Sequence, residues 1–170
     1  MIRAVCDSGP LTHLWQINLW QSLGTFQALH LAARVTQEIR EHVPLEQLET
    51  QTGCALHTHN IPQHKIDAQL QVLSLGLTVP RADIATLILA QQITPELVLT
   101  DDLALRRAIE AQGQTPMGSV GILLRAYKAG LLDTQALSQA MDGLFVHSTL
   151  YLSPAFKSYV QRLVSEQLKR

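Results

Sequence analysis

Short apolar runs alternate with longer segments of helical periodicity along the whole chain. The first run, residues 2–6, ends at Asp7 and is followed by Gly9 and Pro10, a pattern typical of a buried strand leading into a helix. Similar runs predict further strands at 26–31, 54–61, 97–100 and 115–117. The segments between and after them predict helices over about 10–24, 33–42, 45–50, 63–75, 80–92, 103–111, 120–129, 134–144 and 154–168.

Strands separated by helical crossovers predict a particular architecture. They form a parallel sheet, which needs helices on both of its faces. We therefore expect an α/β fold with three layers, in which helices flank a central parallel sheet of four to five strands. Residues 1–170 are expected to form one domain, with the helical segment 131–170 packed on it. In such sheets ligands bind outside the carboxyl ends of the strands.

Composition narrows the class of protein. The chain has 170 residues and 46% hydrophobic residues, as expected of a globular domain with a hydrophobic core. No apolar run approaches the roughly 20 residues of a membrane helix, and the N-terminus lacks the features of a signal peptide. Cys6 and Cys54 make neither a disulfide framework nor a CxxC motif. We expect a soluble protein of the reducing cytoplasm with no membrane partner.

Charge is nearly balanced overall but unevenly distributed. The net charge of −1 argues against a nonspecific coat for nucleic acid. Residues 1–102 carry 5 basic against 10 acidic side chains, whereas residues 103–170 carry 8 against 4. An acidic site followed by basic residues suits a phosphodiester substrate, although random scatter explains the same counts equally well.

The candidate chemistry lies in carboxylates at four places in the chain. Asp7 and the pair Asp101–Asp102 follow predicted strands, and Glu38 and Asp83 lie in predicted helices. Carboxylates that cluster repel one another, and a divalent cation such as Mg²⁺ or Mn²⁺ offsets this repulsion. Each acid alone has a simpler explanation, since Asp102 is also suited to cap the helix from Leu103 and Asp83 to favour the first turn of its own helix.

Competing sites find less support in the sequence. The Asp-x-Asp of haloacid-dehalogenase phosphatases, the P-loop, GxGxxG and the GxSxG elbow are all missing. His57 and His59 share one face of a predicted strand, and His64 lies nearby. A zinc site needs further ligands, and Cys54 is the only thiol close in sequence, so a structural role is favoured for these histidines.

Five short motifs surround the candidate acids and follow one another in the chain. They are Cys6-Asp7-Ser8-Gly9-Pro10-Leu11, Val35-Thr36-Gln37-Glu38-Ile39, Ala82-Asp83-Ile84-Ala85-Thr86-Leu87, Val98-Leu99-Thr100-Asp101-Asp102-Leu103-Ala104-Leu105-Arg106-Arg107-Ala108 and Met117-Gly118-Ser119-Val120-Gly121-Ile122-Leu123. In the order and spacing of these motifs the chain resembles the PIN-domain family, which includes the VapC-type toxins, and in particular its prokaryotic subgroup of PIN-like proteins predicted to bind nucleic acid. The resemblance spans nearly the whole chain.

The resemblance assigns roles to individual positions. Asp7, Glu38 and Asp83 are similar to the first three acids of the family, and both Asp101 and Asp102 match the last one. Ser8 and Thr100 resemble residues that support these acids. The chain departs from the subgroup at Ala82-Asp83, where Gly-Glu is usual, and at Gly9, where Ser is usual.

The family resemblance also implies an activity. The expected function is a metal-dependent ribonuclease in which the five acids hold Mg²⁺ or Mn²⁺ and Arg106 and Arg107 contact RNA phosphates. The resemblance further implies a toxin of a toxin–antitoxin pair, with a small antitoxin as partner and a homodimer as assembly. A non-catalytic module for nucleic-acid binding or protein interaction on the same fold is the alternative.

Overall fold

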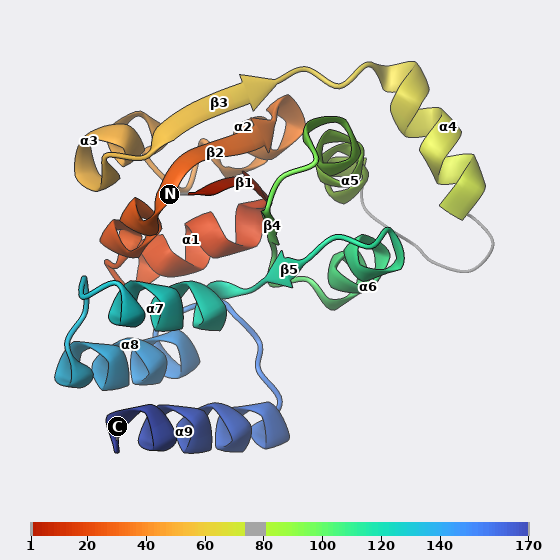
Figure 1. Cartoon of the computed structure of the whole chain (residues 1–170). Helices are drawn as coiled ribbons and strands as arrows, with labels where there is room; N and C mark the ends of the chain where they lie inside the picture. The colour runs from red at the N-terminus through yellow and green to blue at the C-terminus, as the bar shows by residue number, and fades with distance from the viewer. Residues whose placement is uncertain (1, 74–80, 170) are drawn as a thin grey trace.

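A five-stranded sheet forms the centre of the protein, in a computed structural model that describes residues 2–73 and 81–169 (Figure 1). The strand order is β3-β2-β1-β4-β5, and each neighbouring pair is parallel. The strands are β1 (Ile2–Cys6), β2 (Phe26–Ala32), β3 (Ala55–His59), β4 (Leu97–Leu99) and β5 (Pro116–Met117). The prediction of an α/β fold with a central parallel sheet flanked by helices is confirmed.

Helices fill the connections between the strands and continue after the last one. They are α1 (Ser8–Gln16), α2 (Ala33–Ile39), α3 (Leu48–Thr52), α4 (Gln63–Leu73), α5 (Arg81–Ile93), α6 (Leu103–Ala111), α7 (Ser119–Lys128), α8 (Thr134–Val146) and α9 (Pro154–Leu168). Two 3₁₀ helices, η1 (Trp20–Thr25) and η2 (Leu45–Gln47), complete the connections.

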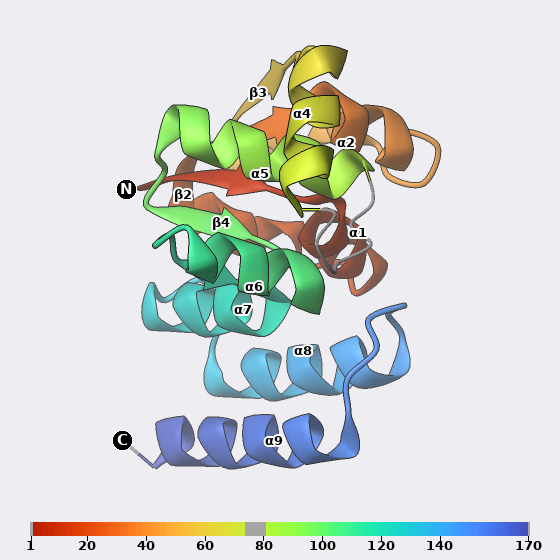
Figure 2. The ribbon, with the colours of Figure 1, turned by 90° about the vertical axis from the view of Figure 1, so that its right-hand side faces the viewer.

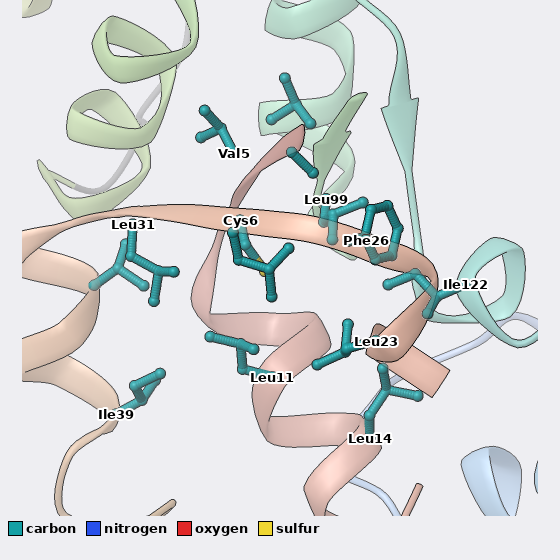
Figure 3. Packing of buried hydrophobic residues seen from close by; sticks show 14 of the residues in the cluster. Val5, Cys6, Leu11, Leu14, Leu23, Phe26, Leu31, Ile39, Leu99 and Ile122 are labelled. Atoms are coloured by element: carbon teal, nitrogen blue, oxygen red, sulfur yellow. The ribbon is translucent and has the colours of Figure 1, made fainter. Parts of the chain in front are cut away.

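The two faces of the sheet are covered by different helices. Successive residues of the central strand point to opposite faces, so Val5 lies on the side of α5 and Cys6 on the side of α1 (Figure 3). Helix α5 packs on β1 and β2. On the other face Leu11 and Leu14 of α1 belong to the same buried core as Cys6. Burial on both faces explains why the second part of β1, Ala4-Val5-Cys6, is apolar without alternation.

The first predicted helix is interrupted. The prediction over about 10–24 is wrong in this respect, because α1 ends at Gln16 and a separate 3₁₀ helix covers Trp20–Thr25. Asn18 between them has a positive φ of 56°, a conformation that Asn tolerates better than most residues. The Trp20 indole N–H donates to the Leu11 carbonyl at 2.8 Å and fixes the turn. Buried Trp20 therefore belongs to the core.

Two other boundaries differ from the sequence prediction or cannot be compared with it. The helix predicted to reach residue 42 ends at Ile39, and turns follow in which the N–H groups of His42 and Val43 both donate to the Ile39 carbonyl. The helix predicted over 63–75 is observed to Leu73, and its last two positions lie outside the described residues, as do Gly76 and Pro80.

The C-terminal helices form a stack beyond α7. In Figures 1 and 2, α8 lies beside α7 and α9 beside α8, farther from the sheet. That residues 1–170 form one domain with 131–170 packed on it stays a prediction. Among the described residues, no helix combines the length and the apolar character needed to cross a membrane.

Candidate functional site

The strand order brings the predicted acids together. β1 and β4 are adjacent and parallel, with Cys6 paired to Leu99, so the residues that follow both strands meet at one edge of the sheet. The Asp7 N–H extends this pairing by donating to the Leu99 carbonyl at 2.9 Å. One pocket at this edge is lined by Asp7, Ser8, Gly9, His13, Glu38, Asp83, Asp101, Asp102, Thr149, Leu150 and Tyr151. All five acids singled out in the sequence therefore line one pocket.

Asp7 stands at the N-cap position of α1 without using its side chain as a cap. Its backbone is extended, as a cap requires, yet the carboxylate makes no capping hydrogen bond. The residue is only 3% exposed. The Thr100 hydroxyl donates to Oδ2 at 3.2 Å, whereas buried Oδ1 has no hydrogen-bond partner within the described structure. A cap would explain an Asp at this position, but the observed geometry does not support that explanation.

Burial and neighbouring charge make Asp7 an unusually weak acid. Its pKa is raised from 3.8 to about 7, first by burial, then by the negative charge of Asp83 and, more weakly, of Glu38. The Ser8 backbone N–H and the Thr100 hydroxyl act in the opposite direction. The ionised carboxylate is therefore disfavoured unless positive charge is supplied.

Asp83 and Glu38 extend the same electrostatic cluster. Asp83 lies in the first turn of α5, and its pKa is raised to about 6 by burial, then by the charges of Asp102 and Glu38. Glu38 lies near the end of α2 with an exposed side chain. The repulsion thus links Asp7, Glu38, Asp83 and Asp102.

Asp101 is held by partners of its own. Its Oδ1 accepts the backbone N–H of Ser119 at 2.7 Å, and its Oδ2 accepts the Ser119 hydroxyl at 2.6 Å. The same Oδ2 lies 2.7 Å from Nδ1 of His13, with which Asp101 forms an ion pair when the imidazole is protonated. Asp101 therefore joins β4 to the start of α7 and to α1.

Asp102 has a different local role. Its Oδ1 accepts the Leu105 N–H at 2.7 Å and caps α6, as the sequence suggested. The Asp102 N–H donates to the Thr100 hydroxyl oxygen at 3.1 Å, and that hydroxyl donates in turn to Asp7. Thr100, which is fully buried, thus connects the acids that follow the two strands.

Gly118 and Arg106 border the anchored carboxylate. A Cβ atom on Gly118 would lie 2.9 Å from Oδ1 of Asp101 and 3.3 Å from a guanidinium nitrogen of Arg106. Glycine is therefore required for the Asp101 side chain to approach the N-terminus of α7 this closely. Arg106 is half-buried beside the site, whereas Arg107 is exposed on α6.

The donor chemistry of the pocket suits a hard divalent cation. Oxygen donors are the ligands that Mg²⁺ and Mn²⁺ prefer, and a cation would offset the repulsion that raises the pKa of Asp7 and Asp83. In their present positions, no three histidine, cysteine or carboxylate side chains among residues 2–73 and 81–169 are grouped closely enough to hold one ion. The Glu38 side chain is exposed, and among the described residues no group donates a hydrogen bond to buried Oδ1 of Asp7.

Two of the three histidines considered as zinc ligands, His57 and His59, belong to a separate cluster, and His64 lies in α4. The third imidazole of this cluster belongs to His30 of β2, which is paired with His57 in the register of β2 and β3. Nδ1 of His30 lies 2.9 Å from Nε2 of His59, and the His30 and His57 rings stack with centroids 5.0 Å apart. Stacked rings do not direct their nitrogens at one point, which favours the structural interpretation.

Sequence reasoning missed several residues of the pocket. His13 interrupts the apolar pattern of the first helix, which was the one signal it offered. Ser119 belongs to one of the motifs that carry the resemblance but was assigned no role, yet it is fully buried and its hydroxyl donates to Asp101. Thr149, Leu150 and Tyr151 carried no signal, because nothing local in the sequence relates them to the acids.

A parallel α/β sheet with an acidic pocket at the carboxyl ends of its strands defines a class to which nucleases belong. Comparison with family models identifies the family of this chain, because the model of the PIN domain DUF3368 matches residues 3–166. The chain belongs to the PIN-domain family, whose members have a nuclease-type fold and are generally nucleases. A search of curated proteins found no match to this chain.

Proposed function

We propose that this protein is a metal-dependent ribonuclease that hydrolyses phosphodiester bonds of RNA. The observation that carries the proposal is Asp7, a buried carboxylate without a capping bond, with one partnerless oxygen and a pKa raised to about 7 beside Asp83. Such an arrangement costs folding stability, and that cost is explained if the pocket exists to hold a cation.

The proposed division of roles follows the contacts. Asp7, Glu38, Asp83 and Asp102 would hold Mg²⁺ or Mn²⁺, because their charges are coupled to one another. When bound, the ion would supply charge neutralisation at the phosphate and activation of the attacking water. Asp101 would position the site, since both of its oxygens are engaged by Ser119 and His13.

Surrounding side chains complete the proposal. Thr100 fixes the orientation of Asp7, and the Ser8 N–H faces the same carboxylate. Arg106, which lies beside Gly118, is assigned to an RNA phosphate, and exposed Arg107 to a more distant one. Action as the toxin of a toxin–antitoxin pair, with a small antitoxin as partner and a homodimer as assembly, rests on the family resemblance alone.

Cleavage of a mixed RNA pool tests the ribonuclease proposal. Purified protein is incubated with Mg²⁺, with Mn²⁺ and with EDTA, beside Asp7→Asn and the matched control Asp142→Asn, an exposed acid of α8 outside the pocket. We expect cutting that needs metal, survives in the control and is lost in Asp7→Asn. Mn²⁺ binding is measured in parallel by calorimetry.

A non-catalytic binding module remains the second candidate. One observation favours it, namely that no three donors among the described residues converge on a point as placed. A folded protein that neither cuts RNA nor binds Mn²⁺ would support this candidate and refute the nuclease. Metal binding without cutting of the pool would instead direct the search to structured or modified RNA.

A further inference from the structure

One wall of the acidic pocket comes from a part of the chain far from the acids in sequence. Thr149, Leu150 and Tyr151 line the pocket together with Asp7 and Asp83. They belong to the link between α8 and α9, which in Figure 2 rises from the end of α8 toward α1 before it returns to α9. None of the three is an acidic or basic amino acid of the kind that lines the opposite side, so this wall differs chemically from the carboxylate wall.

The link is held in place although it has no regular secondary structure. Oε1 of Gln16, the last residue of α1, accepts both the Thr149 N–H at 2.7 Å and the Thr149 hydroxyl at 3.1 Å. The Ser148 hydroxyl donates to the Leu144 carbonyl at 2.6 Å and accepts the Leu150 N–H at 3.2 Å. Leu150 packs against the core, which fixes the backbone immediately before Tyr151.

The backbone after Tyr151 is also fixed. Two residues later, Ser153 caps α9 by accepting the Phe156 N–H at 3.2 Å. Tyr151 nevertheless has 86% of its surface exposed. Within the part of the chain that the structure describes, neither close packing nor a hydrogen bond explains a large aromatic ring at this position.

An exposed aromatic ring on an anchored backbone suits a particular ligand. Nucleobases stack on aromatic side chains when they are unpaired, and a tyrosine ring loses little conformational entropy in doing so. A ring beside an acidic pocket also provides affinity for RNA that the carboxylates cannot, because they repel the phosphate backbone.

We propose that Tyr151 is a substrate-binding residue that stacks on an unpaired nucleobase next to the phosphate held in the acidic pocket. This inference rests on the proposed function and adds a residue that binds the RNA beside the acids. Stacking is tolerant of base identity, so Tyr151 selects for an unpaired base and not for a sequence. A duplex, whose bases stack on one another, is a poor substrate.

Binding of a labelled eight-nucleotide single-stranded RNA, measured by fluorescence anisotropy with Ca²⁺ in place of Mg²⁺, tests the proposal. Tyr151→Ala is expected to weaken binding by about 5- to 150-fold, the range for loss of one base–aromatic stack. Tyr151→Phe keeps the ring and should bind as the wild type does. Tyr159→Ala is the matched control, because Tyr159 is a 51% exposed tyrosine on α9 outside the pocket.

Two further measurements separate the possible outcomes. An RNA with an abasic site at the stacked nucleotide should bind the wild type and Tyr151→Ala equally. A KM for cleavage that is raised in Tyr151→Ala but not in Tyr159→Ala would support the same role. If RNA is bound and cut equally by wild type, Tyr151→Ala and Tyr159→Ala, the stacking role is refuted and the ribonuclease stands. If folded wild type neither binds nor cuts RNA, both proposals are refuted.

Discussion

Replacement of Asp7 by Asn should abolish metal-dependent cleavage while making the metal-free protein more stable. The substitution keeps the volume of the side chain and removes its charge. The Asn carbonyl oxygen can still accept the Thr100 hydroxyl, which now donates to Oδ2 of Asp7. The repulsion from Asp83 and Glu38 disappears, and these two charges are among the causes of the raised pKa of Asp7.

The expected magnitude follows from the pKa. Each pKa unit corresponds to about 1.36 kcal/mol, so raising the pKa of Asp7 from 3.8 to about 7 corresponds to roughly 4 kcal/mol of lost stability at pH 8. The Asn amide would take the place of buried Oδ1, which has no partner, and leaving that amide unpaired costs about 1–3 kcal/mol. The net gain is then roughly 1–3 kcal/mol.

The sign of the effect depends on pH. The folded protein holds the Asp7 proton more tightly than the unfolded chain does, so protonation favours the fold. Wild-type stability is highest below pH 3.8, as far as Asp7 determines it, and falls as the pH rises to about 7. The advantage of Asp7→Asn should accordingly be large at pH 8 and small or reversed at pH 4.5.

Urea unfolding of both proteins in EDTA, at pH 4.5 and pH 8, measures this difference. Thermal melting at pH 8 should show a midpoint about 2–10 °C higher in Asp7→Asn, given the size of the chain. Added Mn²⁺ should stabilise the wild type and leave the variant unchanged. Asp7→Asn that is less stable than wild type at both pH values would mean that Asp7 supports the fold, and the reasoning from its burial and charge would fail.

Other substitutions test the neighbouring contacts. Asp102→Ala should lose about 1 kcal/mol of stability in urea unfolding, because it removes the cap of α6. Asp102→Asn should keep this cap and lose metal affinity, measured by calorimetry. Equal stability of the two variants would argue against the cap. Gly118→Ala should cost about 1–3 kcal/mol and lower cleavage at least about 10-fold, since its Cβ would lie 2.9 Å from the Asp101 carboxylate. Gly9→Ala, whose Cβ would lie 3.4 Å from Asp101, should be milder, and an equal loss would show that crowding of Asp101 is not the cause. The pKa of His30 is lowered from 6.5, first by burial and then by the neighbouring histidines, so the fold loses stability as the pH falls below 6.5. Between pH 7 and pH 5, His30→Gln should therefore lose less stability than the wild type in urea unfolding. An unchanged dependence of stability on pH would contradict this.

Local sequence signals predicted the sheet well and the connections less well. The strands predicted at residues 2–6 and 97–100 leave a clear pattern because their second parts, Ala4–Cys6 and Val98–Thr100, are buried on both faces of the sheet. The break at Asn18 was missed because the contact that fixes it, from the Trp20 indole to the Leu11 carbonyl, competes with helix continuation in a way that periodicity does not register.

The sequence by itself determined that acids would meet at one edge of the sheet. Parallel strands end on the same side, so Asp7 after β1 and Asp101–Asp102 after β4 had to come close once those strands were neighbours. It also determined the family, because the order and spacing of short motifs carry the resemblance, and the family model matches residues 3–166.

Only the tertiary structure decided what each acid does. Asp101 and Asp102 are equivalent in sequence, yet one is anchored by His13 and Ser119 and the other caps a helix. Burial raises the pKa of Asp7, and burial depends on contacts with α5 and β4, far away in the chain. The wall that carries Tyr151 is non-local in the same way, since it reaches the pocket through hydrogen bonds from Thr149 to Gln16. Desolvation and long-range contacts arise only when the chain folds, so neither leaves a pattern along it.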